Sequence, residues 1–227
     1  MKFAVVVFPG SNCDMDCYHA LRDVVQAPVE CVWFREALPP DVTAAVIPGG
    51  FSYGDYLRCG ALAKHAPVMK SVRELAAKGN PVIGICNGFQ ILTETGMLPG
   101  ALLKNTCLHF LCHDVDLKTE RKDTIFSANL KDVVRFPIAH GEGNYYIDAD
   151  GLKRIEDNNQ VLFRYCSPEG VVNDGYNPNG SLNNIAGVLN EQGNVLGMMP
   201  HPERAAEMTL GCDDGKALFE SILGALV

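Results

Sequence analysis

The chain has 227 residues, of which 47% are hydrophobic and 20% are charged, a balance typical of globular proteins rather than disordered ones. Its 19 Lys and Arg against 27 Asp and Glu give a net charge of −8, and no basic run offsets this excess, so nucleic acid is not an expected partner. No segment approaches 18 consecutive apolar residues, and the apolar start at 3–8 is too short for a signal peptide, so neither a membrane span nor secretion is predicted.

The nine cysteines are spaced irregularly along the chain. An odd number without a regular framework indicates a reduced, cytoplasmic protein rather than a disulfide-bonded secreted one. Most of these side chains are expected to be small buried hydrophobes. The question for function is which cysteine is an exception.

The first half of the chain alternates strand and helix patterns. Helical spacing predicts a helix from a Ser11 or Asn12 cap to about Gln26, a second over 68–78 and a third directly after Cys86. Short, nearly continuous apolar runs predict strands buried on both faces at 2–8, 29–34, 44–47 and 81–85. Repeated strand–helix–strand units imply a mainly parallel sheet covered by helices.

The second half has more strand patterns and fewer helical ones. Turn signals separate its segments, and we expect antiparallel pairs that extend the sheet. Asp213 is positioned to cap a last amphipathic helix that carries Ala217, Leu218, Ser221, Ile222 and Leu226. The predicted strands are 108–117, 133–138, 144–147, 161–166, 185–189 and 195–199. No linker or repeat divides the sequence, so a single domain over residues 1–227 is expected.

Cys86 lies in the sequence Gly84-Ile85-Cys86-Asn87-Gly88, between a predicted buried strand and a predicted helix. This is the context of a nucleophile elbow with Cys in place of Ser. The tight turn needs glycine at 84 and 88 to avoid clashes between Cβ atoms and neighbouring backbone. The helix N-terminus then favours the thiolate, the reactive form of cysteine. An incidental pair of glycines beside a buried cysteine is the alternative explanation.

His201 and Glu203 follow the predicted strand at 195–199. Pro202 favours an extended conformation at His201, and in an extended segment the side chains of 201 and 203 project to the same side. The carboxylate could then hold one tautomer of the imidazole, as the third member of a catalytic triad does. A surface turn with a solvated Glu203 is the alternative.

Acyl transfer also needs backbone N–H groups that stabilise an oxyanion. One donor is expected from the amide of Asn87, directly after the nucleophile, and another from a loop at the same sheet edge. Gly49 and Gly50, with Phe51, follow the strand predicted at 44–47 and leave the backbone open to a substrate. An ordinary glycine turn is the alternative.

Three motifs in this order resemble those of the class I, or triad, glutamine amidotransferases: 48–50, 84–90 and 200–203. Four further segments are similar to the glutaminase subunits of phosphoribosylformylglycinamidine synthases, which act in de novo purine synthesis: 8–14, 49–58, 138–143 and 177–181. The resemblance covers essentially the whole chain. It implies one type 1 amidotransferase domain with an α/β, flavodoxin-like three-layer fold, that is, a mostly parallel central sheet with helices on both faces and added antiparallel strands in the second half.

This resemblance implies a role for each motif residue. Cys86 attacks the side-chain amide of L-glutamine, His201 steadied by Glu203 moves the protons, and the amides of Gly50 and Asn87 hold the oxyanion. The implied substrate contacts are Gly49, Phe51, Gln90, His140, Gly141 and Glu142. Tyr53, Asp55 and Arg58 belong to the segment specific to this branch, and no spacing argument decides between a partner surface, an ammonia passage and a solvated loop for them.

The sequence shows no nucleotide site. The run from Gly211 to Gly215-Lys216 is too short for a P-loop and lacks the following Ser or Thr. The resemblance therefore implies that this chain holds no cofactor. It also implies a large synthetase partner that uses ATP and Mg²⁺ to convert formylglycinamide ribonucleotide to formylglycinamidine ribonucleotide, and, as in many such systems, a small bridging subunit.

No metal site is predicted either. If residues 107–113 form a strand, Cys107, His109 and His113 face one side and Cys112 the other, so four ligands cannot converge. Two other functions stay open: a relative with the same fold and protease-like or chaperone-like chemistry, and a regulatory subunit or pseudoenzyme that binds glutamine without turnover.

Overall fold

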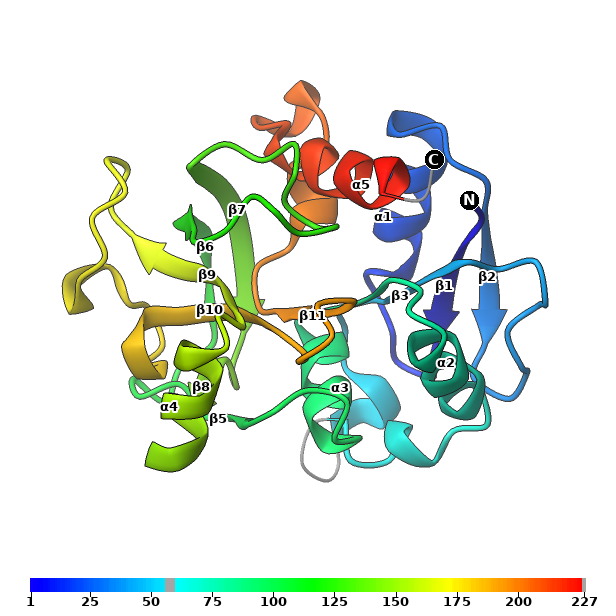
Figure 1. Ribbon diagram of the computed structural model, residues 1–227, viewed down its shortest axis with the longest axis horizontal. Helices are drawn as coiled ribbons and strands as arrows, with labels where there is room; N and C mark the ends of the chain where they lie inside the picture. The colour runs from blue at the N-terminus through cyan, green and yellow to red at the C-terminus, as the bar shows by residue number, and fades with distance from the viewer. Residues whose placement is uncertain (56–59, 226–227) are drawn as a thin grey trace.

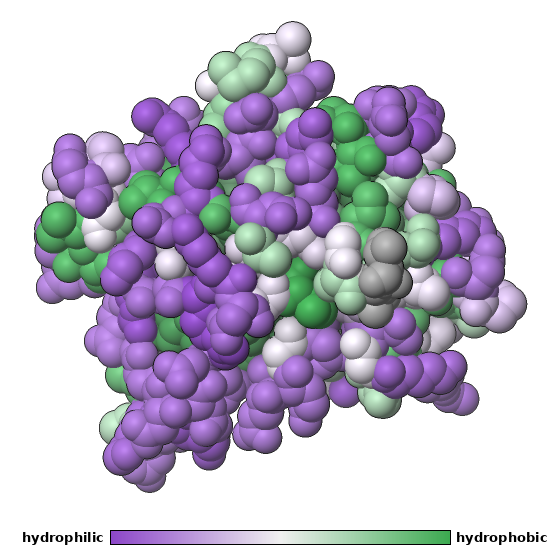
Figure 2. All heavy atoms as spheres, turned by 45° about the horizontal axis from the view of Figure 1, so that its top comes forward, coloured by the Kyte–Doolittle hydropathy of each residue, from purple (hydrophilic) through white to green (hydrophobic). Residues whose placement is uncertain are grey.

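The computed structural model describes residues 1–55 and 60–225 (Figure 1). Arg58 and Leu226 therefore lie outside the described residues. Within them, no helix is both long and apolar enough to cross a lipid bilayer. The face shown in Figure 2 is mostly hydrophilic, with hydrophobic residues in separate patches between the polar ones.

A nine-stranded sheet in the order β2-β1-β3-β4-β11-β10-β9-β6-β7 forms the centre of the described structure. Its parallel half consists of β2 (Val29–Trp33), β1 (Phe3–Val7), β3 (Ala44–Ile47), β4 (Val82–Ile85) and β11 (Val195–Met198). The order of these five is that of flavodoxin-like sheets, in which ligands bind at the carboxyl ends of the strands.

The other half of the sheet is antiparallel, as the turn signals predict. It consists of β10 (Ile185–Leu189), β9 (Val161–Cys166), β6 (Leu111–Thr119) and β7 (Val133–His140). A separate two-stranded sheet pairs β5 (Ala101–Leu103) with β8 (Asn144–Tyr146).

Helices cover both faces of the parallel half. Figure 1 shows α1 (Asp14–His19) and α5 (Asp214–Gly224) together on one side, and α2 (Val68–Ala77) and α3 (Asn87–Glu94) on the other. Strands β3 and β4 are buried along their whole length, as nearly continuous apolar runs predict. The predicted α/β, three-layer fold class is confirmed.

Several local predictions are wrong. The first α-helix, expected from a Ser11 or Asn12 cap to about Gln26, ends at His19, and a π-helical turn over Ala20–Val24 follows it. Its N-cap residue is Cys13, whose side chain makes no capping hydrogen bond. Asp213 is the N-cap of α5 but its side chain makes no capping hydrogen bond. Helix α4 (Ala149–Asp157) was not predicted, because only Gly151 and Ile155 of it are buried and the apolar stripe is correspondingly sparse.

The strand predicted at 108–117 begins only at Leu111. Residues 108–110 instead form an exposed loop, with Leu108 at 77% and Phe110 at 54% exposure. Cys107 and His109 are therefore not on a strand, so the geometric argument against a metal site there rested on a wrong premise. In the described part of the chain, however, Cys107, His109, Cys112 and His113 do not gather into a candidate metal cluster.

Candidate active site

The chain returns four times to one edge of the sheet. Strands β1, β3, β4 and β11 are parallel, so the segments after their carboxyl ends lie along the same edge. These segments carry Cys13, Gly50, Cys86 and His201, respectively. The topology thus gathers residues that are far apart in sequence.

Cys86 occupies a strained turn between β4 and α3, with φ 52° and ψ −106°. A positive φ is costly for a residue with a side chain and persists only where the surroundings enforce it. A Cβ atom added at Gly84 would lie 2.6 Å from the carbonyl oxygen of Gly88, and one added at Gly88 would lie 1.9 Å from that of Ile47. The structure therefore requires glycine at both positions, as the motif predicts.

The Cys86 thiol is buried at the start of α3. Its Sγ lies 3.7 Å from the carbonyl oxygen of Ala139, at the end of β7. Only 5% of the residue is exposed. The first amides of a helix have no carbonyl partner within the helix, so they present partial positive charge to the sulfur.

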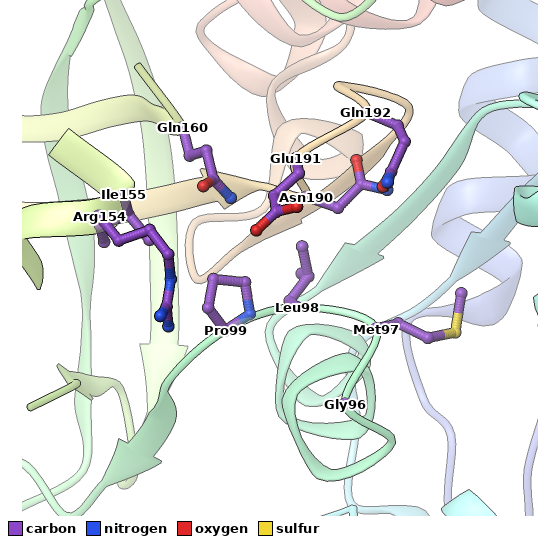
Figure 3. Close-up of a pocket in the computed structure, with 10 residues that line it drawn as sticks. All are labelled: Gly96, Met97, Leu98, Pro99, Arg154, Ile155, Gln160, Asn190, Glu191 and Gln192. Atoms are coloured by element: carbon purple, nitrogen blue, oxygen red, sulfur yellow. The ribbon is translucent and has the colours of Figure 1, made fainter. Parts of the chain in front are cut away.

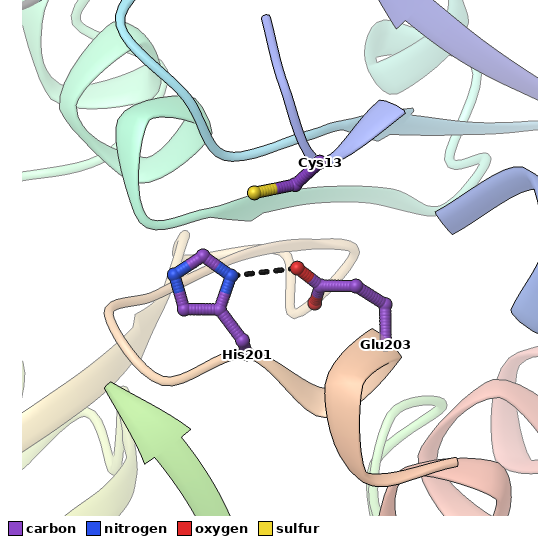
Figure 4. A group of neighbouring side chains, drawn as sticks. All are labelled: Cys13, His201 and Glu203. Carbon is purple, nitrogen blue, oxygen red and sulfur yellow. Dashed lines mark hydrogen bonds and ion pairs between the residues drawn. The ribbon is translucent and has the colours of Figure 1, made fainter. Parts of the chain in front are cut away.

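His201 and Glu203 form a buried pair. The distance between Nδ1 of His201 and Oε1 of Glu203 is 2.6 Å, and the two residues are 1% and 3% exposed. His201 is extended, as predicted, but Glu203 lies in a 3₁₀ turn over Pro202–Ala205, so the side chains do not meet by strand-like projection. The turn brings the carboxylate back to the imidazole, as Figure 4 shows.

The surroundings of His201 favour its charged form. Burial alone would lower its pKa, but the charge of Glu203 and the interactions with Cys86 and Cys13 outweigh burial and raise the pKa well above 6.5. An imidazolium beside a thiolate is the state expected of a cysteine nucleophile with its base.

Gly49 shows how closely Cys86 and His201 approach. A Cβ atom added at Gly49 would lie 2.7 Å from Cε1 of His201 and 3.4 Å from Cβ of Cys86. These two atoms are therefore no more than about 6 Å apart, within the reach of a Cys–His pair in a structure without substrate. The proximity that the motifs predict is present.

The expected oxyanion donors lie in two connected segments. Gly50 has φ 137° and forms an isolated bridge with Ser11, and the amide of Phe51 donates to the carbonyl of Gly10 at 2.9 Å. The side-chain oxygen of Asn87 accepts a hydrogen bond from the amide of Ser52 at 3.2 Å, which joins the loop to the start of α3. A cavity of about 240 Å³ opens here, lined by Asn12, Cys13, Gly50, Phe51, Phe110, Ala139, His201 and Arg204.

Gln90 holds the 140–142 loop beside this cavity without lining it. Its Nε2 donates to the carbonyl of Glu142 at 2.8 Å, and its Oε1 accepts from Nδ2 of Asn87 at 2.9 Å. His140, Gly141 and Glu142 do not line the cavity either. The structure thus places these four predicted substrate contacts next to the site rather than in its open space.

His140 points into the protein. Its Nδ1 lies 3.1 Å from Oδ1 of Asn105, and a Cβ atom added at Gly143 would lie 2.3 Å from its Cε1. Burial first, and then the charge of His201, lower the pKa of His140 to about 4. The side chain is therefore a neutral, packed group in the wall of the site.

Asn105 is a supporting residue that the sequence reasoning missed. It is fully buried, and its Nδ2 donates to the carbonyls of His109 and His140, both at 2.9 Å. Its Oδ1 also accepts from the amide of Gly143 at 3.0 Å. No motif or periodic signal marks this residue, because its role depends on a loop 35 positions later.

Cys13 and Arg204 were also missed, although both line the cavity. Nη2 of Arg204 lies 3.1 Å from Sγ of Cys13.

Tyr53 is tied to the N-terminal segment, because its amide donates to the carbonyl of Pro9 at 2.6 Å and its ring packs against Phe8. The position of Tyr53 thus favours a structural role for its backbone and ring.

A second cavity lies away from this site. It measures about 340 Å³ and is drawn in Figure 3. Met97, Leu98 and Pro99 line it from one side, and Asn190 and Gln192 from the turn between β10 and β11. It contains none of the predicted site residues.

Comparisons with known proteins identify the family of the chain. Residues 1–211 match the model of the CobB/CobQ-like glutamine amidotransferase domain. The chain is 56% identical to the phosphoribosylformylglycinamidine synthase subunit PurQ of Gloeobacter violaceus, covering 99% of this chain and 98% of that one. It is 54% identical to PurQ of Moorella thermoacetica, covering 98% and 95% of the two chains.

Solved structures give the same result. A chain in the structure of PurLQS from Thermotoga maritima matches with a TM-score of 0.87 and 45% identity, covering 100% of this chain and 99% of that one. A glutamine amidotransferase from the same organism shares the fold alone, with a TM-score of 0.55 and 15% identity over 98% and 90% of the chains. The chain belongs to the CobB/CobQ-like glutamine amidotransferase family and, within it, to the PurQ subunits of phosphoribosylformylglycinamidine synthase.

Proposed function

We propose that the chain hydrolyses L-glutamine to glutamate and ammonia through a thioester on Cys86. The observation that carries this proposal is the buried His201–Glu203 pair, which flanks Gly49 together with the strained Cys86 elbow. A nucleophile, a base and a group that orients the base are the parts that acyl transfer from an amide needs.

The steps follow from these positions. The Cys86 thiolate attacks the side-chain carbonyl carbon of glutamine, and the C=O electrons move onto the oxygen, where the amides of Gly50 and Asn87 stabilise the negative charge. As the intermediate collapses, the C–N bond breaks and imidazolium His201 gives its proton to the leaving nitrogen, which departs as ammonia. Neutral His201 then takes a proton from water, the hydroxyl attacks the thioester, and glutamate leaves with the regeneration of the thiolate and imidazolium.

The remaining predicted residues shape the pocket. Gly49 leaves room for the imidazole, and Phe51, which is 46% exposed, lines the cavity where it meets solvent and the substrate enters. Gln90 and the loop of His140, Gly141 and Glu142 contribute through the hydrogen bond that fixes this loop over α3. Because the 140–142 loop does not line the cavity in this structure, its backbone must face the cavity when glutamine binds.

The ammonia serves a synthetase. The relatives are named as subunits of phosphoribosylformylglycinamidine synthase, and the full-length structural match to a chain of PurLQS supports association with a large and a small subunit. In this proposal the large subunit converts formylglycinamide ribonucleotide and ATP, with Mg²⁺, to formylglycinamidine ribonucleotide. The present chain, a single amidotransferase domain over residues 1–227, holds no cofactor and acts in the cytoplasm.

The test combines the chain with its synthetase partners, ATP and formylglycinamide ribonucleotide. Glutamine-dependent product is expected to vanish in Cys86→Ser, while product formed from added ammonium salts persists. Trapping of a glutamyl thioester by mass spectrometry, absent from Cys86→Ala, separates turnover from simple glutamine binding. Glutamine-dependent synthesis by Cys86→Ser at the wild-type rate would overturn the proposal.

A further inference from the structure

A second cysteine lies beside the proposed catalytic imidazole. Cys13, the N-cap of α1, is 2% exposed. Its Sγ, a ring nitrogen of His201 and a carboxylate oxygen of Glu203 all lie within 4.8 Å of one another (Figure 4). Gly49 again permits the approach, because a Cβ atom there would lie 3.1 Å from this sulfur.

We propose that Cys13, His201 and Glu203 form a binding site for Zn²⁺. Thiolate, imidazole and carboxylate are the three protein ligand types that zinc takes, at about 2.0 to 2.3 Å from the metal. Three such ligands leave a fourth tetrahedral position for water. Zinc binding displaces to solvent the proton of the Cys13 thiol and the proton on the ligating nitrogen of imidazolium His201, since only the thiolate and the neutral imidazole are ligands.

Two buried atoms of this cluster have unused capacity. Nε2 of His201 and Oε2 of Glu203 have no hydrogen-bond partner among the described residues, although both side chains are buried. Buried polar atoms are rarely left in this state. Oε2 of Glu203 can therefore supply a lone pair to a cation. The ring nitrogen that such a cation can share with Glu203 is Nδ1, because Nε2 points the other way, so the metal replaces the present contact between Nδ1 and Oε1.

The cavity gives the metal a way in. Cys13 and His201 both line the space of about 240 Å³ that opens between Gly50, Phe51 and Phe110. A hydrated cation can reach the two ligand atoms from this side, and the space can hold the fourth ligand. Glu203 is already beside the ring, with its Oε1 at 2.6 Å from Nδ1.

Arg204 opposes the cation and sets the affinity. Its Nη2 lies 3.1 Å from Sγ of Cys13, and its Nε lies 3.1 Å from a carboxylate oxygen of Asp16. The guanidinium stabilises a thiolate but repels Zn²⁺, so it must turn away when the metal binds. Its side chain is 36% exposed, which gives it room to do so.

The consequence for activity rests on the proposed function. An imidazole that ligates zinc cannot shuttle a proton between Cys86, ammonia and water. Zinc is therefore expected to inhibit glutamine hydrolysis through a cysteine that is not the nucleophile. Binding itself can be measured without any turnover.

Co²⁺ is the probe, because it takes zinc sites and gives a thiolate charge-transfer band in the near ultraviolet. The full-length chain, reduced and free of metal, is titrated with Co²⁺, and Cys13→Ser is titrated in parallel, so that the contribution of the other cysteines is recorded separately. A saturable band of one equivalent is expected in the wild type and in Cys86→Ala. Added Zn²⁺ is expected to abolish it.

Each outcome decides the matter. Loss of the band in Cys13→Ser and Glu203→Gln, with retention in Cys86→Ala, supports the site. A band that survives in Cys13→Ser but disappears in Cys86→Ala, a band lost in both cysteine variants, or no band at all contradicts the ligand set. Thermal unfolding of each variant, with Cys13→Ala as a second substitution, verifies that a lost band does not come from a lost fold.

Discussion

Adding one methyl group at Gly49 tests the close approach on which the proposed chemistry depends. The new Cβ atom of Gly49→Ala would lie 2.7 Å from Cε1 of His201, whereas ordinary contacts begin at 3.4 Å. The imidazole must therefore move by about 0.7 Å, or the glycine loop must move by as much. The φ of Gly49 is not positive, so alanine itself is compatible with the backbone.

The expected loss of activity is large relative to the size of the change. A misplacement of about 1 Å in a reacting group can cost about 10²-fold in rate, equivalent to about 2.7 kcal/mol of transition-state stabilisation. Crowding of a packed site is expected to cost about 1 to 3 kcal/mol of stability as well. We thus expect kcat/KM for glutamine to fall about 10²-fold while the protein remains folded.

The assay measures glutamate release in the presence of the synthetase partners, beside thermal unfolding of the same samples. Gly224→Ala is the matched control, since it adds the same methyl group in α5 at a point where no atom of the described residues lies within 4 Å. That control is expected to keep full activity and to gain about 0.5 to 1 kcal/mol of stability. If folded Gly49→Ala retained kcat/KM within threefold of the wild type, the inferred packing between His201 and Cys86 would be refuted.

Three further predictions concern the groups around this centre. Glu203→Gln removes a charge that raises the pKa of His201. A raised histidine pKa stabilises the folded state most below the ordinary value of about 6.5, and this stabilisation is lost as the pH rises through the folded pKa. The substitution should therefore destabilise the fold more near pH 6 than near pH 9, and equal losses at both would contradict this reasoning. His140, with its pKa lowered to about 4, must stay neutral in the fold while the unfolded chain takes up a proton, so wild-type stability should fall by up to about 3 kcal/mol between pH 6.5 and 4. Urea unfolding of His140→Gln across this range should show a shallower decline, and an unchanged slope would count against the assignment. Asn105→Asp replaces two N–H donors by an oxygen that faces two carbonyls, so it should cost about 2 to 4 kcal/mol in urea unfolding, and a loss under about 1 kcal/mol would mean that the loop does not depend on this amide.

Features set by local chemistry could be predicted from the sequence. The apolar runs of β3 and β4 are buried throughout, and the glycines at 84 and 88 are required by contacts under 3 Å. Such patterns extend over only a few residues, so hydrophobic burial and backbone sterics can be predicted from the local sequence alone. The pairing of His201 with Glu203 was also expected, although a 3₁₀ turn rather than an extended segment produces it.

Features that depend on distant segments were missed. The alternating pattern after Leu108 is typical of a strand, yet Asn105 holds this segment away from the sheet through the carbonyl of His109. Cys13 looked like any buried cysteine, because its neighbours His201 and Arg204 come about 190 positions later. An isolated polar residue carries no periodic signal, so only the folded chain reveals its partners.

The meeting of Cys86 with His201 depends on the register between β4 and β11. Gly84 pairs with Gly197, and the amide of Cys86 donates to the carbonyl of Met198 at 2.8 Å. Both paired glycines face α3: a Cβ atom at Gly197 would lie 2.1 Å from the ring of Phe89, and one at Gly84 would lie 2.6 Å from Leu92. A shift of two residues would bring a side chain under α3 and would move His201 by about 7 Å along the edge. The two glycines, which bear no chemistry themselves, therefore bring the helix against the sheet and fix the distance between nucleophile and base.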